Sequence, residues 1–227
     1  VQVLTMYRKY CATNPAPGQL ILPESLKLLP LYTLGLMKHK GLTSDAALVK
    51  TDERAYLLQR LLTLSSAETA VAVHPRAYPL HTLAPHHGTV NSHGEVMLPA
   101  TVGLSYERLE AEGAYLIDTG EALHFWLGKA LPRSFLQEVF DVHMLGENDA
   151  ARLQLWPRDS DLSQRIVRIV EHIRSMRAMY PMVQVVQQRD AGEAGMLHVF
   201  IEDRAAAVVS YVDFLCQIHT QIQQKMQ

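Results

Sequence analysis

The chain has 227 residues, with 21 lysines and arginines against 23 aspartates and glutamates, so its formal charge is −2 with histidines neutral. This balance argues against a strongly basic nucleic-acid-binding protein. Hydrophobic residues make up 48% and charged residues 19%, which is typical of a globular protein and excludes a disordered chain. The length alone allows either one large domain or two small ones.

Cys11 and Cys216 are the only cysteines in the sequence, and neither has a CxxC partner. This usage favours reduced thiols in a cytosolic protein over a disulfide framework, and it excludes a zinc ribbon built from these residues. No apolar run approaches the roughly 20 residues needed to cross a bilayer, and no secretion signal is recognisable. Because Val1 stands inside a helical pattern, we expect the chain to begin partway through a longer protein.

Residues 1–72 are predicted to form a helical domain that is incomplete. Apolar positions at helical spacing predict a helix over residues 1–10. A second helix is expected to begin near Pro23, with apolar side chains around nearly its whole circumference and a kink at Pro30 in its interior. Thr51 provides an N-cap for a third helix. The expected apolar stripe of this third helix consists of Leu57, Leu58, Leu61 and Leu62.

Residues 73–100 are predicted to be a linker, because four prolines and five of the 11 histidines fall in this stretch. We considered metal binding by His86, His87 and His93, since imidazole is a good ligand for Zn, Ni and Cu. Adjacent histidines in an irregular segment provide no fixed ligand geometry, and no carboxylate or thiolate lies at ligand spacing. The sequence therefore favours a solvated loop here.

Residues 101–227 are predicted to form a sheet flanked by helices. The turn Thr119–Glu121 is expected to join the first two strands in a hairpin. The expected strands cover residues 113–118, 122–128, 153–156, 183–186 and 196–201. The expected helices cover residues 132–140, 160–180 and 208–223.

The chain offers little support for catalysis. Neither a GxGxxG nor a GxxxxGK[ST] phosphate loop occurs, and no GxSxG nucleophile elbow is present. Cys216 and His219 on one helix are interpreted as a buried thiol beside a partly exposed ring, and Trp126 as a core residue. Glu202–Arg204 is interpreted as a solvated turn or a local ion pair. We predict no catalytic, cofactor-binding or metal-binding residue, and the binding residues stay unassigned.

The helix expected over residues 160–180 is the most basic stretch of the chain. Arg165, Arg168 and His172 share one flank by their spacing, which would suit an acidic peptide, a phosphoinositide head group or a neighbouring domain. Arginines on a solvated face that only aid solubility are the favoured interpretation. The arginines of this helix are Arg165, Arg168, Arg174 and Arg177, and the opposing acids are Asp161 and Glu171.

Short segments along nearly the whole chain carry a family resemblance. They are Gln19–Tyr32, Asp52–Tyr56, Leu104–Leu109, Gly113–Asp118 with Gly120, Phe125–Gly128, Leu162–Arg165, Val199–Arg204 and Ser210–Cys216. The first two resemble the helical domain of the cargo-adaptor subunit of the inner COPII vesicle coat. The others are similar to the C-terminal gelsolin-like domain of that subunit.

This resemblance implies an α+β fold class, with an incomplete all-α helical domain followed by a gelsolin-like domain whose mixed sheet is flanked by helices. It also implies a non-enzymatic scaffold and cargo adaptor in transport from the endoplasmic reticulum to the Golgi. The implied partners are the GTPase-activating subunit of the coat and the cytosolic tails of cargo membrane proteins, with no nucleic acid. The protein would be cytoplasmic, and peripheral on endoplasmic reticulum membrane and COPII vesicles. No cofactor is implied for these residues, since the family's zinc ribbon lies upstream.

Two other interpretations remain open at this point. The first is a gelsolin-like module that binds actin or phosphoinositides under calcium control. Calcium-binding gelsolin repeats place an acidic residue directly after the glycine of the hairpin, whereas Ala114 follows Gly113 here and offers no ligand oxygen. The second is a hydrolase or transferase, which is disfavoured because no convergent set of polar residues is evident.

Overall fold

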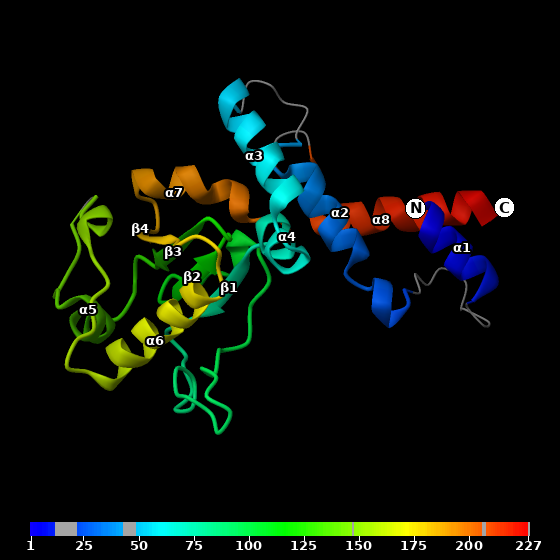
Figure 1. Ribbon diagram of the computed structural model, residues 1–227. Coiled ribbons are helices and arrows are strands. Elements are labelled where there is room, and N and C mark those ends of the chain that lie inside the picture. The colour runs from blue at the N-terminus through cyan, green and yellow to red at the C-terminus, as the bar shows by residue number, and fades with distance from the viewer. Residues whose placement is uncertain (12–21, 43–48, 147, 206–207, 227) are drawn as a thin grey trace. The chain divides into compact units, whose positions relative to one another are not determined.

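The computed structural model describes residues 1–11, 22–42, 49–146, 148–205 and 208–226 (Figure 1). Within these ranges the chain forms eight α-helices, four short 3-10 helices (η1 to η4) and four β-strands. It divides into two compact units. Unit 1 comprises Val1–Gln59 and Ile201–Gln227, and unit 2 comprises Arg60–Phe200.

The centre of unit 2 is a four-stranded mixed sheet. Its strands are β1 (Arg76–Pro79), β2 (Ala114–Asp118), β3 (Ala122–Leu127) and β4 (Met182–Gln187). They lie in the order β1-β2-β3-β4; the first three are antiparallel, and β4 runs parallel to β3. Phe125 of β3 pairs with Leu116 of β2 on one side and with Val185 of β4 on the other. The predicted fold class, a mixed sheet flanked by helices after a helical segment, is confirmed.

The expected hairpin between β2 and β3 is present, with a tight turn at Gly120. The backbone φ of Gly120 is +80°, in the left-handed region that glycine adopts without strain. Asp118 Oδ1 accepts a hydrogen bond of 2.8 Å from the Gly120 amide, which closes the turn. The aspartate at the end of β2 therefore fixes the hairpin connection.

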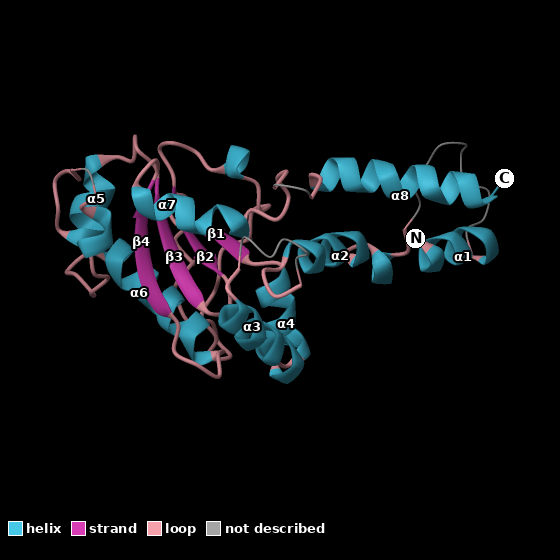
Figure 2. Cartoon of the chain, turned by 90° about the horizontal axis from the view of Figure 1, so that it is seen from above, coloured by secondary structure: helices cyan, strands magenta, loops and turns pink. Residues whose placement is uncertain are grey.

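Helices cover both faces of the sheet in unit 2 (Figure 2). Alternate residues of β3 point to opposite faces, so Phe125 faces the main core while Trp126 faces the other side. The main-core face is covered by α5 (Arg133–Phe140) and α6 (Asp161–Ser175), and the other face by α7 (Ala191–Met196). The helical side chains of the main core include Phe135, Val139, Phe140, Ile166, Ile169 and Ile173.

One helix of unit 2 was not predicted from the sequence. This helix, α4 (Ser66–Val73), starts with a capping box in which Ser65 Oγ accepts from the Glu68 amide and Glu68 accepts from the Ser65 amide. Val71 and Val73 are buried on its inner side. The Ser-x-x-Glu spacing at residues 65–68 was the signal that would have revealed α4.

Unit 1 is helical. It contains α1 (Gln2–Tyr10), α2 (Leu29–Lys38), residues 51–59 of α3 (Thr51–Thr63) and α8 (Tyr211–Met226). Leu4 of α1 packs against Ile218 and Ile222 of α8. At the end of α2, Lys38 Nζ donates hydrogen bonds to the carbonyl oxygens of Ile201 and Asp203. These contacts tie the segment before α8 to α2.

Several predicted elements differ from the structure. Pro30 does not kink a helix interior, because the 3-10 turn η1 (Glu24–Leu26) precedes α2 and Pro30 stands in the first turn of α2. Helix α6 ends at Ser175 instead of residue 180. The strands expected over residues 153–156 and 196–201 are absent. The first segment follows η3 (Ala150–Arg152) without pairing, and the second starts at the last residue of α7 and continues through η4 (Leu197–Val199) into a turn. Short apolar runs fit either kind of element, which explains these two errors.

The predicted domain limits also differ from the compact units. Residues 73–100, expected as a linker, include the edge strand β1. Helix α8, expected in the second domain, clusters with unit 1 because Ile218 and Ile222 bury their side chains against Leu4. Ile218 and Ile222 are the buried residues of α8 among those described, and Val212 is largely exposed.

Candidate functional site

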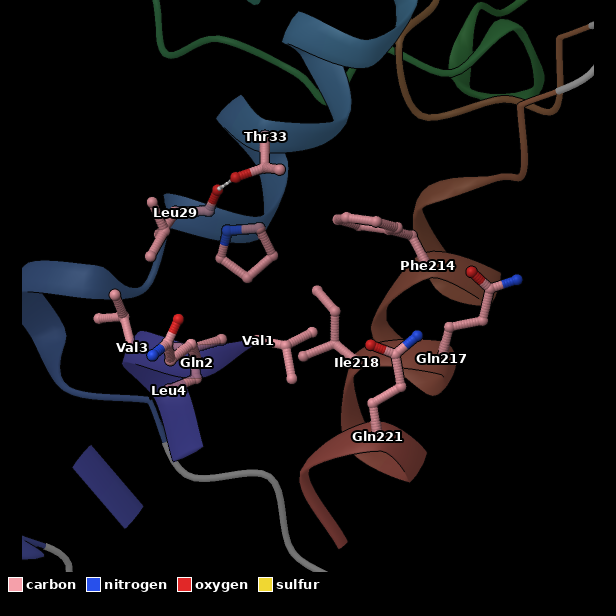
Figure 3. A pocket seen from close by; sticks show the side chains of 11 residues that line it. Val1, Gln2, Val3, Leu4, Leu29, Thr33, Phe214, Gln217, Ile218 and Gln221 are labelled. Atoms are coloured by element: carbon pink, nitrogen blue, oxygen red, sulfur yellow. Dashed lines mark hydrogen bonds between the residues drawn. The ribbon is translucent and has the colours of Figure 1, made fainter. Parts of the chain in front are cut away.

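A groove in unit 1 is lined by α1, α2 and α8 and has a volume of about 350 Å³ (Figure 3). Leu4, Pro30 and Ile218 are the buried lining residues, and Phe214 of α8 also contributes. The full lining is Val1, Gln2, Val3, Leu4, Leu29, Pro30, Thr33, Phe214, Gln217, Ile218 and Gln221. The wall is therefore mainly apolar.

The polar groups of this groove suit binding more than catalysis. Gln217 and Gln221 are exposed one turn apart on α8, so both carboxamides lie along the same side of the groove. The Thr33 hydroxyl donates to the Leu29 carbonyl at 2.7 Å and is thus already engaged. Among the described residues that line the groove, none has an ionisable side chain. The groove can hold an apolar side chain while the glutamines pair with a peptide backbone.

The arginines of α6 do not form a free basic flank. Arg165 donates from Nη1 to the Ala84 carbonyl at 2.9 Å and to the His87 carbonyl at 3.3 Å. Arg168 Nη1 donates to the Gly88 carbonyl at 2.8 Å. The interpretation of solvated arginines is therefore wrong for both side chains, because they clamp the main chain of the loop 84–88. His172 lies half-buried on the same helix.

Arg174, in the last turn of α6, and Arg177, which follows this helix, are also engaged. Arg174 pairs with Glu171 at 2.7 Å and donates to the Pro181 carbonyl at 3.1 Å. Arg177 forms an ion pair with Asp118, whose side chain is fully buried. These guanidinium groups hold loops and strands of unit 2 together, so they leave little positive charge for an acidic ligand.

The histidine-rich loop is ordered by its own contacts. His87 Nδ1 accepts a hydrogen bond of 3.1 Å from the Ala84 amide, and the His86 and His87 rings meet edge to face at 4.3 Å. Burial lowers the pKa of His87, and the nearby His86 and Arg165 lower this pKa further. Within the described residues, no group of three or more His, Cys, Asp or Glu side chains could hold a metal ion. The loop is thus clamped rather than simply solvated.

Trp126 belongs to the core, as predicted. Its ring is fully buried, and Nε1 donates to Glu193 Oε1 at 2.7 Å. Glu193 Oε2 in turn accepts from the Arg189 amide at 2.8 Å. The buried carboxylate of α7 therefore ties this short helix to the sheet, a role that the sequence analysis missed because the two residues are far apart in the chain.

The remaining candidates form no convergent site. Cys216 is exposed, so the prediction of a buried thiol is wrong, and His219 Nε2 lies 3.1 Å from Gln223 Nε2. The Glu202–Arg204 segment forms a turn, and Arg204 pairs with Asp213 at 2.9 Å. A local ion pair was one of the two interpretations predicted here.

One partly buried histidine, His124, is expected to make the stability of unit 2 depend on pH. Burial lowers the pKa of His124 on β3, and its Nδ1 has no hydrogen-bond partner among the described residues. As the pH falls through about 6.5, the unfolded chain takes up this proton before the folded chain does, so the folded state loses stability. We expect His124→Gln to flatten the fall in the urea midpoint between about pH 7 and pH 5.

The exposed His93 provides the matched control for this measurement. His93→Gln should leave the pH dependence of the urea midpoint unchanged. An equally steep fall in the His124→Gln variant and in the unmodified chain would contradict the assignment. Some slope should persist in that variant, because burial also lowers the pKa of His87 in unit 2.

Comparison with known proteins identifies two domain types, one in the first third of the chain and one after it. The family described as the Sec23/Sec24 helical domain matches residues 1–71, and the gelsolin repeat matches residues 95–179. Among the described residues, none of the helices combines the length and the apolar composition required to cross a bilayer. The chain therefore carries a helical domain followed by a gelsolin-like domain.

Individual relatives show which proteins contain this combination of domains. The chain is 35% identical over 227 residues to the Arabidopsis thaliana protein transport protein SEC24 B, covering 100% of the chain and 20% of that protein. It is 35% identical over 224 residues to Homo sapiens protein transport protein Sec24C, covering 98% of the chain and again 20% of the relative. The crystal structure of the human COPII-coat protein Sec24c matches with a TM-score of 0.84 at 35% identity, covering 100% of the chain and 29% of that structure. Along its whole length the chain is thus homologous to a segment of the Sec24 proteins, and it spans about a fifth of their length.

Proposed function

We propose that this chain is part of a COPII coat subunit that selects cargo for transport from the endoplasmic reticulum to the Golgi. The observation that carries the proposal is the match to the human COPII-coat protein Sec24c over 100% of the chain, across both domain types, with a TM-score of 0.84. Several relatives are also named as protein transport proteins. An apolar groove without ionisable side chains fits a role in binding rather than in catalysis.

The finer parts of the proposal follow from the same relationship. We propose that the parent protein works with the GTPase-activating subunit of the coat and with the cytosolic tails of cargo proteins. It would act from the cytoplasm, at the surface of the endoplasmic reticulum membrane and of COPII vesicles. We further propose that these 227 residues act as a scaffold without enzymatic activity and without a cofactor, and that zinc belongs to another part of the parent protein.

The gelsolin alternative receives less support. The gelsolin repeat match occurs together with the Sec23/Sec24 helical domain, and the named relatives are transport proteins. Ala114 begins β2 directly after Gly113, so the position where a calcium-binding repeat supplies an acid carries only a methyl group.

A chimera tests the proposed function. Human Sec24C in which the homologous segment is replaced by this chain should assemble with its coat partner and package cargo in a vesicle budding reaction with endoplasmic reticulum membranes. The chain alone should remain in the supernatant when filamentous actin is sedimented. A folded chimera that fails to enter the coat, or a chain that sediments with actin, would overturn the proposal.

A further inference from the structure

Four large apolar side chains of unit 2 are exposed on the segment that follows α6 and at the first residue of β4. These side chains are Met176, Met179, Tyr180 and Met182, which are 44%, 62%, 63% and 66% exposed. We call the surface of these four residues the methionine patch. Four large apolar side chains within seven residues exceed the scattered exposure that is normal on a protein surface.

The methionine patch is held in place by arginines that lie beneath it. The Arg174 guanidinium stacks on the Tyr180 ring at 4.1 Å, and its Nε binds the Pro181 carbonyl. Arg60, from the end of α3, places Nη1 3.2 Å from Met179 Sδ. The side chains of Arg174 and Arg60 are only 14% and 15% exposed. The patch is therefore a supported surface and not a free loop.

In the ion pairs that border the methionine patch, the carboxylates are exposed and the arginines are largely covered. Glu171 pairs with Arg174 and is 52% exposed, and Glu121 pairs with Arg60 at 3.2 Å and is 40% exposed. Glu68 Oε1, at the start of α4, accepts from the Ala178 amide at 3.4 Å. The carboxylates thus face solvent while their arginine partners are largely covered, so the rim of the patch presents negative charge.

We propose that the methionine patch docks a peptide segment whose apolar side chains are flanked by lysine or arginine. Methionine side chains are flexible and polarizable, so they adapt to apolar side chains of different shapes. The exposed carboxylates of Glu171 and Glu121 attract the flanking cations. Cytosolic segments next to membrane-spanning helices are rich in lysine and arginine, and in this respect the inference rests on the proposed function in cargo selection.

The first test measures binding of a defined peptide to the whole chain. The probe is a short labelled peptide with leucines at its centre and lysines at both ends. Its binding is measured by fluorescence anisotropy. The double variant Met179→Ser with Met182→Ser should weaken binding by about tenfold or more. Met144→Ser is the matched control, because Met144 is 68% exposed elsewhere in unit 2 and its loss should leave the affinity unchanged.

The second test concerns the charged rim. Replacing both Glu171 and Glu121 by glutamine should weaken the binding of the same peptide and make its affinity depend less on salt concentration. A peptide with glutamates in place of its lysines should bind at least about tenfold more weakly to the unmodified chain. Urea unfolding of each variant checks that unit 2 remains folded. Equal affinity of the double methionine variant, or equal binding of the acidic peptide, would overturn the inference.

The results of the peptide-binding tests can be distinguished from the result of the test of the proposed function. If the Sec24C chimera packages cargo but the lysine-flanked peptide does not bind the chain, the docking inference is wrong and the coat function stands. If the peptide binds at the methionine patch but the chimera does not enter the coat, the docking site is real and the proposed coat function is wrong.

Discussion

Arg177→Met is expected to lower the free energy of unfolding of unit 2 by about 3–5 kcal/mol, because it leaves a buried carboxylate without its counter-charge. Asp118 is fully buried, and the Arg177 side chain is only 7% exposed. The remaining described hydrogen bond to the Asp118 side chain comes from the Gly120 amide. Urea unfolding followed by circular dichroism measures the loss, provided that the slope with denaturant is unchanged.

Arg152→Met is the control for this ion pair. Arg152 and Asp149 lie 3.8 Å apart, with side chains that are 85% and 48% exposed. An exposed pair of this kind contributes between zero and about 1 kcal/mol, so its removal should shift the urea midpoint little. If both substitutions had equally small effects, the structural importance assigned to the Arg177–Asp118 pair would be wrong.

Gly128→Ala should destabilise unit 2 by about 3 kcal/mol or more, because the added methyl group would collide with the main chain. A Cβ atom on Gly128 would lie 2.0 Å from the carbonyl oxygen of Ala111 and 2.5 Å from its carbonyl carbon. Backbone hydrogen bonds of 2.8 Å, from Gly128 to Gly113 and from Ala130 to Ala111, hold the two segments at this separation. Thermal and urea unfolding of the variant should both show the loss.

Gly195→Ala is the matched substitution with the opposite expected sign. Apart from its chain neighbours and the backbone of its own helix, no atom of the described residues lies within 4 Å of a Cβ built on Gly195, near the end of α7. Alanine has a higher helix propensity than glycine and makes the unfolded chain less flexible. The free energy of unfolding is therefore expected to rise by up to about 1 kcal/mol. A loss of similar size in both glycine variants would show that the close approach at Gly128 is not the cause.

Periodicity was sufficient to predict the elements with one buried face. The predicted helix over residues 132–140 corresponds to α5, where Phe135, Leu136, Val139 and Phe140 are buried. The hairpin was predicted instead from the turn Thr119–Glu121 between two apolar runs, and all five residues of β2 are buried. The strand predicted over residues 196–201 was wrong. This run is as apolar as a buried strand, but its buried residues Met196, Val199 and Phe200 belong to the end of α7, to η4 and to the residue after η4.

The candidate sites were less predictable than the fold. Spacing placed Arg165 and Arg168 correctly on one flank of α6, but their partners are carbonyl groups about eighty positions earlier in the chain. Main-chain partners leave no pattern of side chains to read in the sequence. The groove of unit 1 was not predictable either, because its lining comes from three separate helices. The residues of the methionine patch are close together in the sequence, but the contact of Met179 with Arg60 of α3 is not visible there.

The arginine clamp on residues 84–88 has a consequence for protein engineering. Arg165 and Arg168 bind carbonyl groups, so most side chains of this loop can be exchanged without removing the clamp. Gly88 is the exception, because its φ is +77° and a Cβ atom would lie 2.7 Å from Arg165 Cβ. The loop therefore offers a place to graft a short epitope or a fluorophore-binding sequence beside Gly88, with the anchoring provided by helix α6 and not by the grafted residues.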